Sequence, residues 1–307
     1  MDYDLIANLS WNVTFNTDIA PDESMSMIFH EIVFSVICLV GIIADGLIIY
    51  ILQRFKNMQS STNVYIVNWL ISDAVYLLLT PCFYRIFSAL EDLFIGEEIV
   101  CISFEFASVL QITSIVFIGV LCINWFLTVY TVRFGRFSRI VVVGVWLAAA
   151  ASIVTFSSFC VQQLYSLYSH YILFFGYAAL MCTVAAMHVA RYTTRWCDAH
   201  DKLRLNLTLV TVYVICWFPS WLCLLIASVI ESYLLLYYLS IIAACLGYLN
   251  PLVNVYVFAK VNKNFRMCLL QVFRFVHRDY DDAAQSFEDS DDNFNNIHVD
   301  MHNVHHI

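Results

Sequence analysis

Charged residues are scarce in this sequence. Only 13% of its 307 residues are Asp, Glu, Lys or Arg and 61% are hydrophobic, whereas about a quarter of the residues in an ordinary soluble domain are charged. A mean hydropathy of +0.75 requires long apolar runs rather than one buried core. These values exclude a soluble enzyme of one or two domains, a disordered chain and a collagenous chain. A polytopic membrane protein remains.

Phosphate-binding loops, metal-ligand spacing and net positive charge are also missing. The eight glycines form no phosphate loop, and the histidines and cysteines do not follow the spacing of a metal site. We therefore predict that the chain is not an enzyme and holds no cofactor apart from a sodium ion. The net charge of −9 argues against a nucleic-acid partner. The 11 cysteines, scattered through apolar runs, indicate packing residues and room for one bridge rather than a disulfide framework.

Seven apolar segments dominate the sequence, and each is long enough to cross about 30 Å of hydrocarbon as a helix. The connections are short, so consecutive helices must be antiparallel neighbours. No internal repeat is visible, which disfavours an inverted-repeat transporter. We predict an all-α membrane protein, a seven-transmembrane helix bundle with spans at 28–52, 63–86, 100–129, 140–161, 168–190, 205–230 and 233–257.

The bundle, 28–259, is flanked by segments of different character. Residues 1–27 are polar and acidic and predict an extracellular tail. Residues 260–278 carry apolar side chains on one helical face and arginines on the other, which predicts an eighth helix in the membrane interface with lipid as its partner. Residues 279–307 are acidic and predict a disordered cytoplasmic tail.

The basic residues give the chain an orientation. All Lys and Arg except Arg85 fall in the first, third and fifth connections or after the last span. The positive-inside rule puts these regions in the cytoplasm and the N-terminus outside. Asn8 and Asn12 each begin a glycosylation triplet, which agrees with this orientation. We predict a multi-pass protein of the plasma membrane.

Several short motifs occur in a fixed order along the spans. They are NWLISD (68–73) in span two, Thr80-Pro81, Trp146 in span four, CWFP (216–219) in span six and NKNFR (262–266) before the eighth helix. Together they resemble landmarks of the rhodopsin-like (class A) family of G-protein-coupled receptors, nearest to its peptide-receptor branches. The resemblance implies a receptor whose extracellular ligand favours movement of span six around Trp217 and Pro219, with a G protein or arrestin as cytoplasmic partner.

The transmission motifs depart from the family pattern. Where the family has an acid–arginine–tyrosine triplet at the end of span three, this chain has Asn124, Trp125 and Phe126. In span seven the NPxxY motif begins either at Asn250 or at Asn254, and the spacing to the eighth helix favours Asn254, with Phe258 in place of the tyrosine. These losses leave a second function open, a non-coupling decoy, scavenger or accessory receptor.

Two acids are expected inside the bundle. Asp73 lies near mid-membrane, where a charge costs roughly 2.5–3.5 kcal/mol on insertion scales. The resemblance implies a sodium pocket, whose oxygen ligands suit a hard cation and would be Asp73, Ser114, Asn250 and Asn254. A water-filled network around a protonated Asp73 is the alternative. Asp45 stands where the family has asparagine, and since two neighbouring carboxylates do not both ionise cheaply, we predict that Asp45 is protonated at rest or shares the cation.

The resemblance also implies two cysteine modifications. One is a disulfide between Cys101 and Cys160, which an extracellular setting permits, with a free buried Cys160 as the alternative. The other is palmitoylation of Cys268 beside the membrane.

The outer connections are acidic, which favours a cation or a basic peptide as extracellular ligand. A solvated surface explains the same charges. Span seven has no lysine for retinal, and Ser108 stands where amine receptors carry aspartate, so a peptide or lipid-like ligand remains. Candidate ligand-binding residues are Arg85, Phe104, Glu105, Ser108, Trp217, Trp221 and Tyr237, although Arg85 and Glu105 are equally placed to pair with each other.

Overall fold

The computed structural model describes residues 21–90, 97–129, 138–161, 167–194, 201–226 and 233–273. Almost all of these residues are helical. The elements are α2 (Pro21–Arg54), η1 (Lys56–Met58), α3 (Ser61–Leu90), α4 (Glu97–Val129), α5 (Ser138–Val161), α6 (Leu167–Thr194), α7 (Asp201–Ile226), α8 (Tyr233–Tyr248), α9 (Asn250–Val261) and α10 (Lys263–Val272).

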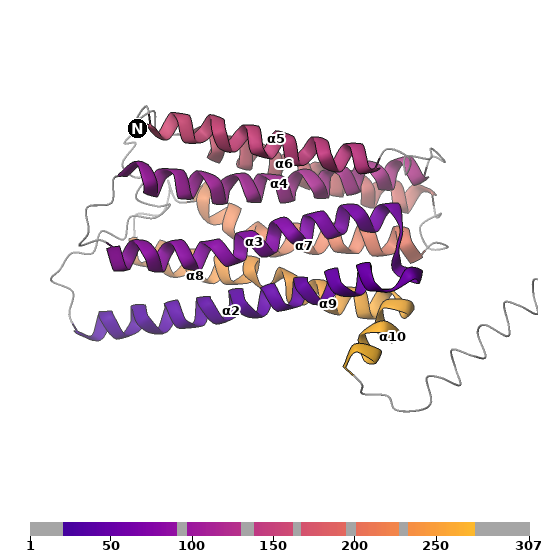
Figure 1. Ribbon diagram of the computed structural model, residues 1–307, viewed down its shortest axis with the longest axis horizontal. Helices are drawn as coiled ribbons and strands as arrows, with labels where there is room; N and C mark the ends of the chain where they lie inside the picture. Colours follow the sequence, from indigo (N-terminus) through magenta and orange to yellow (C-terminus); the bar gives the residue numbers. More distant parts are fainter. Residues whose placement is uncertain are drawn as a thin grey trace, which may run out of the picture.

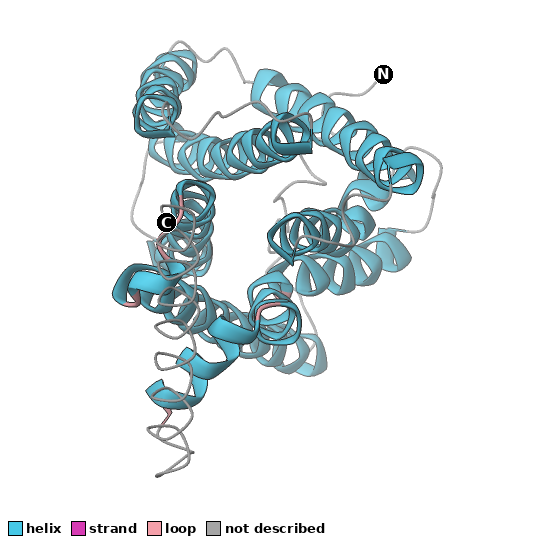
Figure 2. Ribbon diagram, turned by 90° about the vertical axis from the view of Figure 1, so that its right-hand side faces the viewer, coloured by secondary structure: helices cyan, strands magenta, loops and turns pink. Residues whose placement is uncertain are grey.

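The helices form one elongated bundle. Within the described residues, seven segments are long and apolar enough to cross a membrane, the seventh being α8 and α9 together. They run side by side in Figure 1, while the short α10 turns away from the bundle at one end. Figure 2 shows the same bundle from that end. The predicted all-α, seven-helix fold is therefore confirmed.

Helix α4 lies at the centre of the bundle, because it packs against α3, α5, α6 and α7. Two hydrogen bonds join α3 to α4 and to α5. The Ser72 hydroxyl donates to the Leu110 carbonyl at 2.8 Å, and the Trp146 indole N–H donates to Asn68 Oδ1 at 2.8 Å. The span-two motif and the tryptophan of span four thus meet in space.

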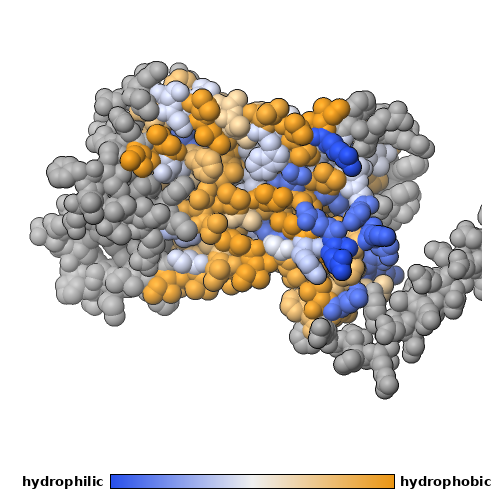
Figure 3. Space-filling view, in the orientation of Figure 1, coloured by the Kyte–Doolittle hydropathy of each residue, from blue (hydrophilic) through white to orange (hydrophobic). Residues whose placement is uncertain are grey.

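The outward faces of the helices are apolar. Ile140, Val143, Leu147 and Val154 of α5 are between 57% and 69% exposed. Figure 3 shows hydrophobic side chains over the middle of the bundle and hydrophilic ones gathered toward the end that carries α10. A soluble monomer rarely exposes so continuous an apolar surface, whereas lipid tails solvate it well.

The seventh span is interrupted at Leu249. Helix α8 ends at Tyr248, and α9 begins at Asn250 with Pro251 in its first turn. Proline has no N–H to donate to the carbonyl of Gly247, four residues earlier, and its ring disfavours a straight helix there. Span seven also ends later than predicted, at Val261 rather than at residue 257.

Helix α10 corresponds to the predicted interfacial helix. It covers Lys263–Val272, a shorter range than the predicted 260–278, and residues beyond 273 lie outside the described part. The Asn262 side chain caps it by accepting a hydrogen bond from the backbone N–H of Phe265 at 3.1 Å. Phe265 and Cys268 are buried and form the face that meets the bundle.

Candidate functional site

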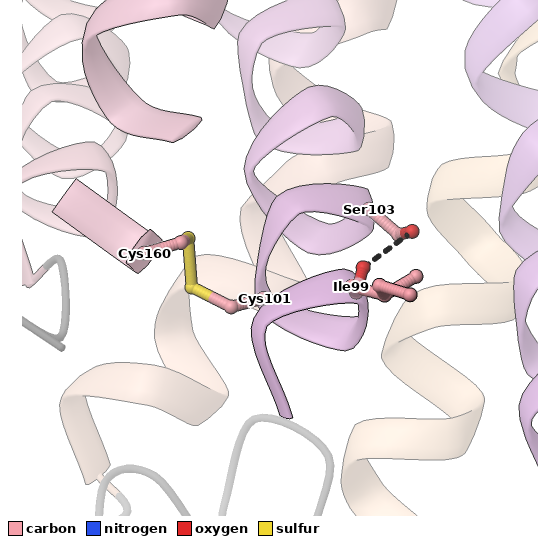
Figure 4. Close-up of a disulfide and its surroundings, with 4 residues drawn as sticks. All are labelled: Ile99, Cys101, Ser103 and Cys160. Carbon is pink, nitrogen blue, oxygen red and sulfur yellow. Dashed lines mark hydrogen bonds between the residues drawn. A yellow bond between two sulfur atoms is a disulfide. The ribbon is translucent and has the colours of Figure 1, made fainter. Parts of the chain in front are cut away.

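A disulfide joins the two helix ends on the side of the bundle opposite α10. Cys101, in the second turn of α4, is bonded to Cys160 near the end of α5, with their Cα atoms 5.8 Å apart (Figure 4). The predicted pairing is therefore confirmed. Because the bond closes a 59-residue separation, it removes much of the freedom that α4 and α5 would have in the unfolded chain.

The candidate ligand residues lie around this disulfide end. Glu105 is one turn further along α4 and only 6% exposed, and Trp221 of α7 is 8% exposed. Phe104 and Ser108 are half-buried on α4. The side chains of Arg85 and Tyr237 lie outside the described part of the structure, although their helices, α3 and α8, are described.

An aromatic cluster lies beneath these residues. The Trp217 ring is surrounded by Tyr76, Tyr213 and Tyr248, with ring centroids at 6.3, 6.3 and 5.7 Å. The hydroxyls of Tyr76 and Tyr248 share a hydrogen bond of 3.2 Å. The cluster joins α3, α7 and α8. The sequence interpretation named only Trp217, although Tyr213, Trp217 and Trp221 are spaced four residues apart and share one face of α7.

The position of the Trp217 ring also depends on Gly247, the residue before Tyr248. A Cβ atom at Gly247 would lie 3.0 to 3.2 Å from three carbons of the indole ring. The indole therefore packs directly on the backbone of α8, just before the helix break. Any rotation of Trp217 changes its contact with both α8 and the tyrosines.

A group of buried polar side chains occupies the middle of the bundle. Asp45 on α2 is 0% exposed and Asp73 on α3 is 4% exposed, and these two helices pack against each other. Ser114, Asn250 and Asn254 are each at most 1% exposed. Within the described residues, hydrogen-bond partners are missing for the Asp45 carboxylate, the Ser114 hydroxyl and both asparagine amides.

The donor set of this group fits a hard cation. Each unsatisfied buried polar group costs about 1–3 kcal/mol, so water or an ion is needed to satisfy them. Carboxylate, hydroxyl and amide oxygens are the ligands that hard cations prefer. Among the described residues, no three His, Cys, Asp or Glu side chains converge on one point, so the donors do not resemble a zinc site.

The triplet Asn124, Trp125 and Phe126, which differs from the family pattern, ties α4 to α3 and α7. The Trp125 side chain is fully buried, and its indole N–H donates to the carbonyl of Leu203 on α7 at 3.0 Å. The Asn124 amide donates to the Thr62 hydroxyl on α3 at 3.2 Å. Phe126 packs edge-on against Trp125, with centroids 5.2 Å apart. An uncharged contact thus holds α7 against α4 near the α10 end.

Helix α7 is held at further points that the sequence did not reveal. The Tyr177 hydroxyl of α6 donates to the Val214 carbonyl at 2.6 Å, and its ring stacks on Trp221 at 5.1 Å. Val214 lies five residues before Pro219, which interrupts the hydrogen bonding of α7. Because the acceptors of Trp125 and Tyr177 are backbone carbonyls, no side-chain motif marks these contacts.

Phe258, in the position expected for a tyrosine, links the bundle to α10. It is 0% exposed, and its ring lies 4.9 Å from that of Phe265. With no hydroxyl, it packs but donates no hydrogen bond.

Known proteins provide an independent comparison. No protein-family profile matches the chain. Rat somatostatin receptor type 4 is 22% identical over 86% of this chain and 80% of its own length, and rat neuropeptides B/W receptor type 1 is 24% identical over 78% and 85%. Squid rhodopsin shares the fold with a TM-score of 0.55, at 16% identity over 84% of this chain and 87% of its own. The chain is therefore similar in sequence to these peptide receptors and shares its fold with rhodopsin.

These similarities set the context of the chain. The named relatives are receptors rather than enzymes. Together with the seven apolar segments of the described residues, they support a multi-pass protein of the plasma membrane. Asn8 and Asn12 lie outside the described residues. Cys268 is only 7% exposed against the bundle, and burial raises the pKa of its thiol. Its palmitoylation stays a prediction.

Proposed function

We propose that this receptor binds a basic peptide on its extracellular side. The named relatives are receptors for somatostatin and for neuropeptides B/W. In this chain, acidic residues crowd the N-terminal tail and the second-to-third connection, and they attract a ligand of opposite charge. Glu105, buried one turn from the disulfide, adds a desolvated carboxylate at that end of the bundle.

Peptide binding can be tested on cells that display the full chain. A library of basic peptides is panned against the receptor, and the affinity of each hit is compared between wild type and Glu105→Gln. We expect a loss of about 30-fold or more, because truncating a buried charge partner costs about 2 kcal/mol or more. Glu97→Gln, which removes a carboxylate at the start of the same helix, is the control and should cost far less. Equal losses in the two variants would reduce the role of Glu105 to general surface charge.

Signal transmission is proposed to run through α7. Peptide contact at Trp221 and Trp217 would favour a state in which α7 has moved away from α4, as a shift between two populated arrangements. The observation that supports this most is the Trp125–Leu203 hydrogen bond of 3.0 Å, since it holds α7 at the end that a cytoplasmic transducer would approach. Arg139 and Arg204 are exposed at that end and suit an acidic partner surface.

A second function, a non-coupling decoy or accessory receptor, is favoured by the same triplet. Trp125 is uncharged and fully buried, and Phe258 has no hydroxyl, so neither offers the polar group that the family pattern has at these positions. The two functions differ in one outcome. A bound peptide accelerates guanine-nucleotide exchange on a G protein if the receptor couples, and leaves exchange unchanged if it is a decoy.

We also propose that Asp73, Ser114, Asn250 and Asn254 hold a sodium ion, with Asp45 beside them. A bound ion would supply positive charge to two carboxylates that otherwise repel. The unsatisfied oxygens of Asp45, Ser114 and the asparagines support this proposal. The N-terminus is proposed to face outside, and glycans on Asn8 and Asn12 of receptor isolated from cells would test that orientation.

A further inference from the structure

A histidine and a threonine join α6 to α7 on the lipid-facing side of the bundle. The Nε2 atom of His188 on α6 lies 2.9 Å from the hydroxyl oxygen of Thr211 on α7. The imidazole is exposed, and both residues lie within helices long and apolar enough to cross a membrane. Neither residue belongs to the motifs that resemble the receptor family.

The surrounding hydrogen bonds fix which atom donates in this contact. The Thr211 hydroxyl has one hydrogen, and it donates this hydrogen to the Leu207 carbonyl at 2.6 Å. The hydroxyl oxygen therefore accepts from His188, whose Nε2 carries the hydrogen. Leu207 in turn donates its backbone N–H to the Leu203 carbonyl within α7, and that carbonyl also accepts from Trp125 of α4. One row of hydrogen bonds along α7 thus receives a donor from α6 and another from α4.

Both donors act on the part of α7 that precedes Pro219. Proline interrupts the hydrogen bonding of a helix and allows it to bend. At 1.5 Å per residue, Leu203 lies about 24 Å and Thr211 about 12 Å along the axis from Pro219. A bend at Pro219 that carries Leu203 a few ångströms from α4 therefore shifts Thr211 by about half as much. A shift of that size breaks a hydrogen bond of 2.9 Å if His188 stays in place.

Helix α6 is held in place by its packing against the bundle. Its buried side chains recur every three or four residues and form one stripe, made of Leu173, Tyr177, Leu180, Val184 and Met187. Helix α4 packs more extensively against α6 than against α7. For α6 to follow α7, this packing would have to be broken, whereas His188 and Thr211 share one hydrogen bond. Separation of α7 from α6 at this bond is therefore the less costly movement.

We propose that His188 is a positioning residue that holds α7 in its docked arrangement, and that α7 leaves α6 as well as α4 when it moves. The bond to Thr211 acts beside the Trp125–Leu203 contact and adds to the free energy that a ligand must supply to shift the population. In a membrane, a side-chain hydrogen bond between helices typically changes such an equilibrium about threefold. This inference rests on the proposed movement of α7, but it depends neither on the ligand nor on G-protein coupling.

The test measures three distances in the full-length receptor in lipid nanodiscs. Spin labels at positions 128, 189 and 204, all exposed, are placed in pairs on α4, α6 and α7. They are attached through an unnatural amino acid, so that the native cysteines are kept. In Trp125→Phe, which removes the donor from α4, we expect the α4–α7 and α6–α7 distances to lengthen together while the α4–α6 distance stays fixed. A fixed α6–α7 distance beside a longer α4–α7 distance would overturn the proposal, because α6 and α7 would then move as one unit.

Variants at the two positions test the hydrogen bond itself, without ligand and with Trp125 intact. His188→Leu and Thr211→Val each remove one partner and should enlarge the longer α6–α7 population about threefold. The double variant should do no more than either single variant, since all three lose the same bond. Thr211→Ser keeps the hydroxyl and should behave like wild type. Thr208→Val is the matched control, because the Thr208 hydroxyl donates to the Arg204 carbonyl at 2.8 Å and, among the described residues, has no bond to α6.

Three outcomes would contradict a positioning role for His188. The first is an unchanged population in His188→Leu and Thr211→Val. The second is an equal rise in Thr208→Val, which would show only the loss of a hydroxyl from α7. The third is a rise in Thr211→Ser as large as in Thr211→Val. A receptor that fails to accelerate nucleotide exchange would refute G-protein coupling alone and leave these distances as they are.

Discussion

The contact between Trp125 and Leu203 gives the sharpest prediction about α7. Trp125→Phe removes the indole N–H that donates to the Leu203 carbonyl at 3.0 Å and keeps an aromatic ring in the buried site. The carbonyl keeps its bond within α7, so the change costs one net hydrogen bond of about 0.5–1.5 kcal/mol. This free energy corresponds to an increase of about 2- to 12-fold in the ratio of displaced to docked α7 without ligand.

The displacement can be measured directly. Spin labels at positions 128 and 204, both exposed, report the distance between α4 and α7. We expect the longer-distance population to grow in Trp125→Phe. Trp146→Phe is the matched control, because it removes an indole N–H bond of 2.8 Å to Asn68 that does not involve α7. An unchanged distribution in Trp125→Phe, or the same change in the control, would show that the Trp125–Leu203 hydrogen bond does not hold α7 against α4.

Three further predictions concern the disulfide, the aromatic cluster and the buried acids. Cys101→Ser, Cys160→Ser and the double variant should lower the thermal midpoint equally, since each loses the same bond, worth about 4 kcal/mol for a 59-residue separation; additive losses would contradict this. Gly247→Ala should destabilise by about 1–3 kcal/mol through overpacking against an indole ring 3.0 Å away, whereas Gly144→Ala, with nothing within 4 Å, should be neutral in the same thermal melts. Asp45→Asn should raise the sodium concentration needed for half of the thermal stabilisation about tenfold, measured against potassium at equal ionic strength. An unchanged sodium response would exclude Asp45 from the ion site.

The spans were predictable because each is a long apolar run, and lipid selects for that pattern over any other. The position of the helix break within the seventh span was not predictable in this way. The apolar run of this span continues through Pro251, while the helix breaks at Leu249, two residues earlier. The cause is a missing backbone hydrogen bond to Gly247, which proline imposes four residues upstream of itself.

The candidate site was predictable in its residues but not in its contacts. The resemblance singled out Trp125 and Trp217 because they stand at motif positions. It gave no indication of Leu203 or Val214, since these residues accept through their backbone carbonyls, which every residue type carries. Tyr76 of α3 and Tyr248 of α8 come together only through the tertiary arrangement of the bundle, which no local pattern encodes.

The most direct test of the central claim is guanine-nucleotide exchange by the purified receptor. The receptor is mixed with a panel of heterotrimeric G proteins, with and without a basic peptide that binds it, and the exchange rate is recorded. We expect peptide-driven exchange on at least one G protein and a raised basal rate in Trp125→Phe. A peptide that binds tightly yet changes exchange on none of them would contradict G-protein coupling and establish the decoy function instead.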